Sequence, residues 1–80
     1  MNKIEIDIHG MSVEEAKTYL QKRIKSIGPN TEEIVIVHGN NGGDKLAKMV
    51  RKDLKHKRIK QKILSLNAGI TTLLIKKADS

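Results

Sequence analysis

Apolar residues follow two different periods along the chain, and each change of period marks a new element. In residues 3–9 isoleucine alternates with polar residues, which predicts a half-buried strand. From Val13 to Ile27 apolar residues recur every three or four positions, which predicts a helix with one core-facing stripe. Ser12 and Glu15 have the spacing of a capping box, so this helix should begin at Val13 and stop at Gly28-Pro29.

The second half of the chain predicts a strand, a helix and a hairpin. Residues 34–37 are all β-branched and indicate a buried strand, and a basic helix should follow from about Asp44 to Lys57. Residues 58–66 predict a third strand, with Ile59 and Ile63 on one side and lysines between them. The short turn after it makes the final strand, residues 70–76, its antiparallel partner.

The order β-α-β-α-β-β predicts an α/β (α+β) two-layer sandwich: a four-stranded mixed sheet with both helices on one face. Because a helix joins the first two strands, they should be parallel. Eighty residues allow one domain, residues 1–80, with a core of about 3–77. The chain has no cysteine, no apolar run of about 20 residues and no signal-peptide pattern, so we expect a cytoplasmic protein with no membrane contact.

The excess positive charge lies in one stretch of the chain. Nine of the eighteen residues from Lys45 to Lys62 are Lys or Arg and one is acidic, whereas the rest of the chain is nearly neutral. A one-signed run favours a polyanionic partner, and nucleic acid, RNA or DNA, is the commonest. With Tyr19 the only aromatic residue, contacts should fall on the nucleic-acid backbone. The phosphate-binding face should comprise Lys45, Lys48, Arg51, Lys52 and Lys55, which share one arc of a helical wheel.

A glycine-rich turn joins the second strand to this basic helix. Such a turn can hold a phosphate, because its backbone N–H groups point outward and the helix N-terminus carries partial positive charge. The turn matches neither the Walker A pattern nor GxGxxG. Asn41 and Asp44 are alternative N-caps for the helix. The candidate phosphate-binding residues of the turn are Gly39, Asn40, Asn41, Gly42 and Gly43.

Three polar side chains are candidates for catalysis. Asp7 and His9 lie on one face of the first strand, and His38 follows the second strand. Because ligands gather at the carboxyl ends of parallel strands, all three should share an edge with the glycine turn. An imidazole can act as general acid or base near neutral pH, which suits phosphodiester cleavage. No cofactor is evident; a divalent metal such as Mg²⁺ suits this chemistry, but no ligand cluster supports one.

These residues resemble a known family. Ile6-Asp7-Ile8-His9-Gly10 is similar to the LDLHG motif of the small MutS-related (Smr) domain, His38-Gly39 to its HGxGxG motif, and residues 67–72, NAGITT, to its closing segment. The resemblance spans nearly the whole chain and departs from the family at Asn41, where a glycine is usual. It implies a fold like the C-terminal domain of translation initiation factor three, with nucleic-acid binding, and nicking or endonuclease activity in several members. It also implies that Asp7 and His9 serve cleavage and that His38, Gly39 and Gly43 serve binding or catalysis.

Three functional hypotheses follow. The first is an endonuclease in which Asp7 assists His9, His38 contacts the scissile phosphate, and Gly42 and Gly43 cradle it. The second is a non-catalytic RNA- or ribosome-binding module that uses the same basic helix and keeps the histidines for structure. The third is an adaptor for an acidic protein surface. The sequence leaves the choice between DNA and RNA, and the oligomeric state, open.

Overall fold

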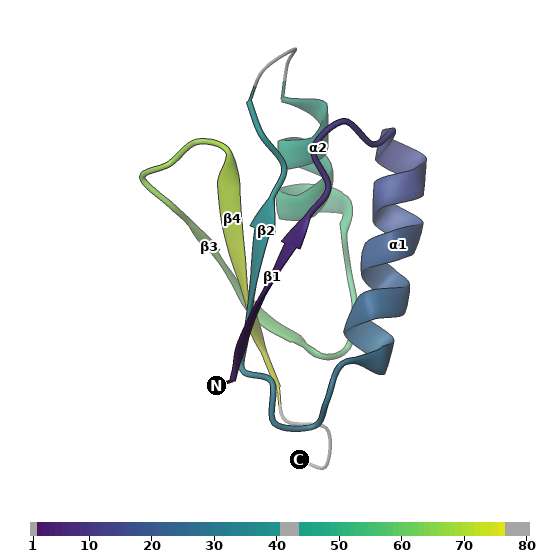
Figure 1. The fold of residues 1–80 in the computed structure, drawn as a ribbon, viewed down its shortest axis with the longest axis vertical. Coiled ribbons are helices and arrows are strands. Elements are labelled where there is room, and N and C mark those ends of the chain that lie inside the picture. The colour runs from purple at the N-terminus through teal and green to yellow at the C-terminus, as the bar shows by residue number, and fades with distance from the viewer. Residues whose placement is uncertain (1, 41–43, 77–80) are drawn as a thin grey trace.

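The fold is a four-stranded sheet with two helices on one face (Figure 1). The computed structural model describes residues 2–40 and 44–76. Strand order in the sheet is β1-β2-β4-β3, with β1 and β2 parallel and the other neighbours antiparallel. The predicted two-layer architecture and mixed sheet are therefore confirmed. The elements are β1 (Lys3–Asp7), α1 (Val13–Ser26), β2 (Glu33–Val37), α2 (Lys45–Lys48), the π-helical turn η1 (Met49–Asp53), β3 (Ile59–Leu64) and β4 (Ile70–Ile75).

Helix α1 begins where its capping box predicts. The Ser12 hydroxyl accepts from the Glu15 backbone N–H at 3.2 Å, and the Ser12 N–H donates back to the Glu15 carboxylate at 3.3 Å. Two N–H groups that the first turn leaves without helical partners are thereby satisfied. The helix ends at Ser26, two residues before Gly28 and Pro29. Its buried stripe, Ala16, Leu20 and Ile24, faces the sheet.

The core lies between the helices and one face of the sheet. The alternating strands β1, β2 and β4 turn every second residue toward the helices, and the residues between them face the open side. Burying each large aliphatic side chain contributes roughly 1.5–3 kcal/mol, which is what holds an aliphatic domain of this size together. The core residues are Ile6, Ile8, Ala16, Leu20, Ile24, Ile34, Ile36, Met49, Val50, Leu54, Leu73 and Ile75.

The second helix is shorter than predicted, which corrects the expected span of Asp44 to Lys57. Helical structure ends at Asp53, and the last turn is a wider π turn in which the Leu54 N–H donates to the Met49 carbonyl at 2.7 Å. Leu54 follows this turn. Its backbone is extended, not helical, and its side chain lies in the core with no exposed surface. Lys55 therefore lies beyond the helix and outside the predicted basic arc.

The facing of β3 also differs from the prediction. A bulge between Ile59 and Gln61 adds one residue and reverses the alternation that follows. Ile63 is consequently 41% exposed, whereas Lys62 turns to the helix side and is half-buried. The Lys62 Nζ donates to the carbonyls of Leu54 at 2.6 Å and Arg51 at 3.2 Å, which lie at the end of η1. Burial, with a smaller effect of nearby Lys55, lowers the pKa of Lys62.

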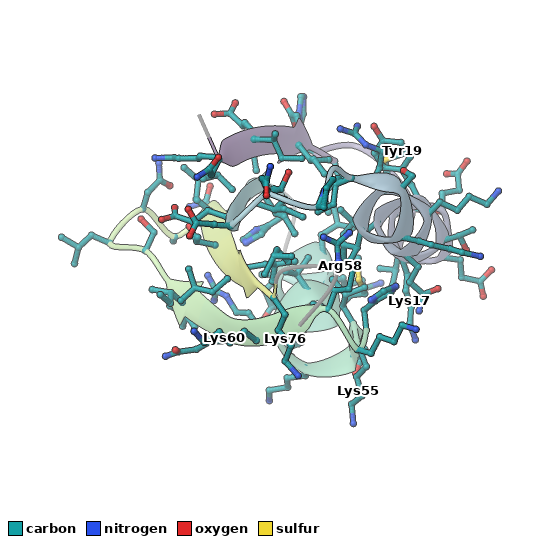
Figure 2. All side chains as sticks on the ribbon, turned by 90° about the horizontal axis from the view of Figure 1, so that it is seen from below. Lys17, Tyr19, Lys55, Arg58, Lys60 and Lys76 are labelled. Atoms are coloured by element: carbon teal, nitrogen blue, oxygen red, sulfur yellow. The ribbon has the colours of Figure 1, made fainter. Side chains whose placement is uncertain are left out.

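Arg58, another member of the basic run, is used to build the fold. Its Nη1 donates to the Ile24 and Ile27 carbonyls at 3.0 and 3.1 Å, and its Nη2 to the Gly28 carbonyl at 3.3 Å. The guanidinium thus caps the C-terminal end of α1, beside which it is labelled in Figure 2. Because α1 has 14 residues, this end lies about 21 Å from its N-terminus.

We expect Arg58→Met to lower the free energy of unfolding by about 2 kcal/mol, because the last carbonyls of α1 lose a charged donor. Among residues 2–40 and 44–76 the buried Arg58 Nε has no hydrogen-bond partner, which keeps the loss of stability from being larger. The matched control is Lys57→Met, since Lys57 is exposed, and its effect should stay within about 0.5 kcal/mol. Urea unfolding of both variants measures the difference. Equal losses would contradict a capping role for Arg58.

We also expect a contribution from His56 to the pH dependence of stability. Burial, and then the nearby cations of Arg58, Lys57 and Lys25, lower the pKa of His56 below 6.5. The folded state therefore binds fewer protons, so stability is lost as the pH falls from about 6.5 through the lowered folded pKa. Urea unfolding between about pH 7 and pH 5 should show a shallower loss in His56→Gln than in the wild type. An unchanged slope would exclude this contribution.

Candidate catalytic and nucleic-acid site

Three segments that are far apart in the sequence meet where β1 and β2 end, at the top of Figure 1. The Ile8 N–H donates to the Val37 carbonyl at 2.9 Å and extends the parallel pairing past β1. The N–H groups of His38 and Gly39 both donate to the Gly69 carbonyl, at 2.9 and 3.0 Å. Residues 7–10, 38–40 and 67–69 therefore form one continuous edge.

Gly39 and Gly69 allow this close approach. Gly39 has φ +75°, a backbone conformation that side chains rarely adopt, and a Cβ there would lie 3.5 Å from the His9 Cβ. Gly69 is buried, and a Cβ there would lie 3.2 Å from the Gly39 Cα. The Asn67 Oδ1 accepts from the Gly69 N–H at 2.9 Å and fixes the conformation of the hairpin turn.

Asp7 and His9 form an exposed pair at this edge. The Asp7 Oδ1 accepts from the His9 backbone N–H at 3.0 Å and contacts the His9 Nδ1 at 2.5 Å. The hydrogen bond from the His9 side chain, and then that from its backbone, lower the pKa of Asp7. Because the carboxylate holds Nδ1, Nε2 is the nitrogen left to accept or donate a proton. The side chains are 49% and 71% exposed for Asp7 and His9, so both are accessible to a ligand.

His38 lies beneath the surface, 3% exposed, and both ring nitrogens are engaged. Its Nδ1 lies 3.0 Å from the Gly39 carbonyl, which can only accept, so in the neutral ring this nitrogen carries the proton. The Nε2 then accepts from the Thr71 hydroxyl at 2.9 Å, and the same hydroxyl oxygen accepts from the Arg51 Nε at 2.9 Å. Arg51, Thr71, His38 and Gly39 thus form a directed chain that holds the turn after β2.

An open cleft of about 710 Å³ lies beside the Asp7–His9 pair. The loop from β1 to α1 supplies one wall, and the end of β2 and the start of α2 supply the other. The N-terminus of α1 opens into the cleft, although Glu14 and Glu15 in its first turn offset the positive end of the helix dipole. The lining residues are His9, Gly10, Met11, Ser12, Val13, Val37, His38, Gly39, Asn40, Lys45 and Leu46.

Four of the five residues of the predicted basic face are exposed, and the fifth, Arg51, is half-buried. Lys45 is exposed and lines the cleft, and Lys48 is exposed with its Nζ 3.6 Å from the Asp44 Oδ2. Arg51 turns inward to Thr71. Lys52 and Lys55 are both exposed.

Part of the predicted glycine turn lies outside the described residues. Gly39 and Asn40 line the cleft, but Asn41, Gly42 and Gly43 fall in the segment that is not described. Helix α2 takes Asp44 as its N-cap residue, the second of the two predicted alternatives, and within the described helix the Asp44 carboxylate accepts no capping hydrogen bond.

Over residues 2–40 and 44–76, no group of three His, Cys, Asp or Glu side chains is arranged to hold a metal ion. In the same part of the chain, none of the helices is long and apolar enough to cross a membrane.

Thr71 and the apolar walls of the cleft were not among the site residues predicted from the sequence. One signal pointed to Thr71. It shares the inward face of β4 with apolar residues, and a hydroxyl buried on such a face needs a hydrogen-bond partner. Met11, Val13 and Leu46 gave no comparable signal, because their periodicity is that of ordinary core residues. Only the meeting of two loops makes them walls of one cleft.

These elements form a small α+β domain with an acid–histidine pair and Gly39 at the carboxyl edge of its sheet. The Smr domain model matches residues 6–73, and the chain belongs to the Smr domain family, a family of nucleic-acid-binding domains. The crystal structure of the Smr domain of Thermus thermophilus MutS2 is similar, with a TM-score of 0.79 and 20% identity, over 90% of this chain and 96% of that one. No curated protein matches the chain.

Proposed function

We propose that this Smr domain is an endonuclease that cuts a phosphodiester of RNA or DNA at the Asp7–His9 pair. The observation that carries the proposal is the exposed imidazole, oriented by a carboxylate and open to a cleft. The Asp7 carboxylate is charged at neutral pH, and its hydrogen bond to the His9 ring lowers its pKa further, so it can stabilise the imidazolium that forms when His9 takes a proton.

In the proposed reaction the His9 Nε2 removes the proton of the attacking hydroxyl, which is water or, in RNA, the 2′-hydroxyl. The new P–O bond forms as the bond to the leaving oxygen breaks, and that oxygen takes a proton from the imidazolium or from water. Lys45, exposed at the cleft, offsets the charge that develops on the phosphate. His38 takes a positioning role, because its ring nitrogens already bind Gly39 and Thr71.

A cleavage assay tests this proposal. The wild-type protein is incubated with labelled structured RNA, single-stranded RNA and supercoiled plasmid, each with Mg²⁺ or with EDTA. We expect one class of substrate to be cut, and the two ionic conditions report metal dependence. Binding without cutting of any substrate would reject the endonuclease.

A second candidate function is a non-catalytic RNA- or ribosome-binding module. The burial of His38 favours it, since only one exposed histidine remains at the edge to serve acid–base chemistry. Both candidates share the lysines of α2 and η1 and require a polyanionic partner. They differ in whether bonds in that partner are broken.

We expect the double variant Lys45→Gln/Lys52→Gln to weaken nucleic-acid binding under either candidate. Each lysine that contacts a phosphate releases counterions, so losing both should reduce the slope of log K against log[salt] by about 1.5. Lys22→Gln/Lys25→Gln, which removes two exposed lysines from α1, is the matched control and should leave the slope unchanged. Fluorescence anisotropy at several salt concentrations measures both. Equal slopes for the two variants would remove α2 and η1 from the interface.

A further inference from the structure

We propose that the cleft beside His9 takes the base of one unpaired nucleotide, so that the protein acts on single-stranded or looped nucleic acid. This inference rests on the proposed function and names the substrate of that same site. Its starting point is the character of the walls. Four apolar residues line the cleft. Met11 lies in the loop before α1, Val13 is the first residue of α1, Val37 is the last residue of β2, and Leu46 lies in α2.

These walls are apolar and only half-buried. Met11, Val13 and Leu46 pack against the core on one side and leave surface open to the cleft on the other. A phosphate-binding site gains nothing from apolar walls, because phosphate is held by N–H groups and cations. The face of a nucleobase is largely apolar, so covering it removes apolar surface of both partners from water. The walls therefore fit a base better than a phosphate.

The position of the cleft links this base to the cleavage chemistry. His9 lines the cleft and is held by Asp7, so a nucleotide seated there would place its own phosphodiester next to the imidazole. Lys45 at the same cleft is exposed and suited to a neighbouring phosphate. The volume of about 710 Å³ lies within the range of pockets that hold small organic ligands. One site thus offers apolar contacts for a base, a cation for a phosphate and an acid–base group for the bond that is cut.

The same walls predict weak preference among bases and a strong preference for unpaired ones. No aromatic side chain lines the cleft, so the contact is by apolar area, which every base offers. A base within a duplex is stacked and paired, and it would have to be flipped out before it could enter. The net charge of +7 favours a nucleic-acid strand over an apolar peptide as the occupant.

Removal of single bases tests this inference. A single-stranded oligonucleotide that the wild-type protein binds and cuts at a defined bond is prepared with one abasic nucleotide at each position in turn. We expect one position next to the cut bond to weaken binding by about tenfold, and the other positions to change it little. The matching hairpin, in which that nucleotide is paired, should also bind more weakly.

A substitution in the wall connects the effect to the cleft. In the Leu46→Gln variant, removing the base at that position should weaken binding little further, because the contact between the base and the cleft wall is already lost. Leu64→Gln, on the edge strand β3 and 61% exposed, is the matched control and should retain the tenfold loss. Circular dichroism shows whether both variants are folded. If Leu46→Gln unfolds, Val13→Thr takes its place, because it makes the wall more polar and keeps its shape.

The outcomes separate this inference from the function on which it rests. If base removal changes binding equally little at every position of an oligonucleotide that is still cut, the base site is overturned and the endonuclease stands. If base removal at one position still weakens binding to the same extent in the folded Leu46→Gln or Val13→Thr variant, the base site is also overturned. Absence of any nucleic-acid binding would reject both.

Discussion

His9→Ala should abolish cleavage while leaving the protein folded and able to bind nucleic acid. The imidazole is 71% exposed, so its removal should change the free energy of unfolding by no more than about 0.5 kcal/mol. Loss of a positioned acid–base group lowers a rate by about a hundredfold to ten-thousandfold. Single-turnover cleavage of the best substrate, with anisotropy for binding, measures the two effects separately.

A conservative pair of variants sharpens this result. Asp7→Asn keeps an oxygen near the His9 Nδ1 but loses the charge that stabilises the imidazolium, so cleavage should fall without a matching loss of binding. Glu5→Gln makes the same chemical change two residues earlier on β1, at another exposed position, and should have no effect. A His9→Ala protein that still cuts would move the chemistry to another residue. One that loses folding and binding together would make the pair structural.

Thr71→Val should destabilise the protein by about 2–4 kcal/mol, although the two side chains have the same shape. Thr71 has no exposed surface, and its hydroxyl serves the Arg51 Nε and the His38 Nε2. Its removal leaves the buried His38 Nε2 and the half-buried Arg51 Nε without that bond, and each buried group that loses its partner costs about 1–3 kcal/mol. For a domain of this size the loss corresponds to a fall in Tm of roughly 10–30 °C, which calorimetry can measure.

The neighbouring residue provides a close control. Thr72 lies on the other face of β4 and is half-buried, so Thr72→Val should change stability by no more than about 0.5 kcal/mol. Arg51→Met, combined with Thr71→Val, should cost less than the sum of the two single changes, because both act on one hydrogen-bonded chain. Equal Tm values for the two threonine variants would show that the chain contributes nothing to stability.

Much of the architecture follows from residue patterns that act over short distances. The alternation in β1, the capping box of α1 and the β-branched run of β2 each select an element locally. The helical crossover then makes β1 and β2 parallel, and the short turn makes β3 and β4 an antiparallel pair. Asp7 and His9 project from one strand face because side chains alternate along a strand. His38 joins them at the same edge because the carboxyl ends of β1 and β2 lie together.

Patterns of charge were less informative, because the role of a cation depends on the group that lies opposite it. A helical wheel places Arg51 among exposed lysines, but it contains no information about Thr71, which reaches the same point from β4. Arg58 and Lys62 likewise turn toward carbonyl groups at the ends of two helical segments. Each of these contacts joins residues 8 to 34 positions apart, so composition alone describes them only as part of a basic run.

The sequence by itself determined the order of the elements, the parallel start of the sheet, the acid–histidine pair and the likeness to the Smr family. These follow from backbone periodicity and from residues that are close in the chain. The tertiary structure alone decided that His38 is buried, that η1 ends the second helix early, and that a bulge reverses the facing of β3. It also formed the apolar cleft beside His9. The physical reason is that burial and hydrogen-bond partners depend on which segments pack together, and no local pattern contains that information.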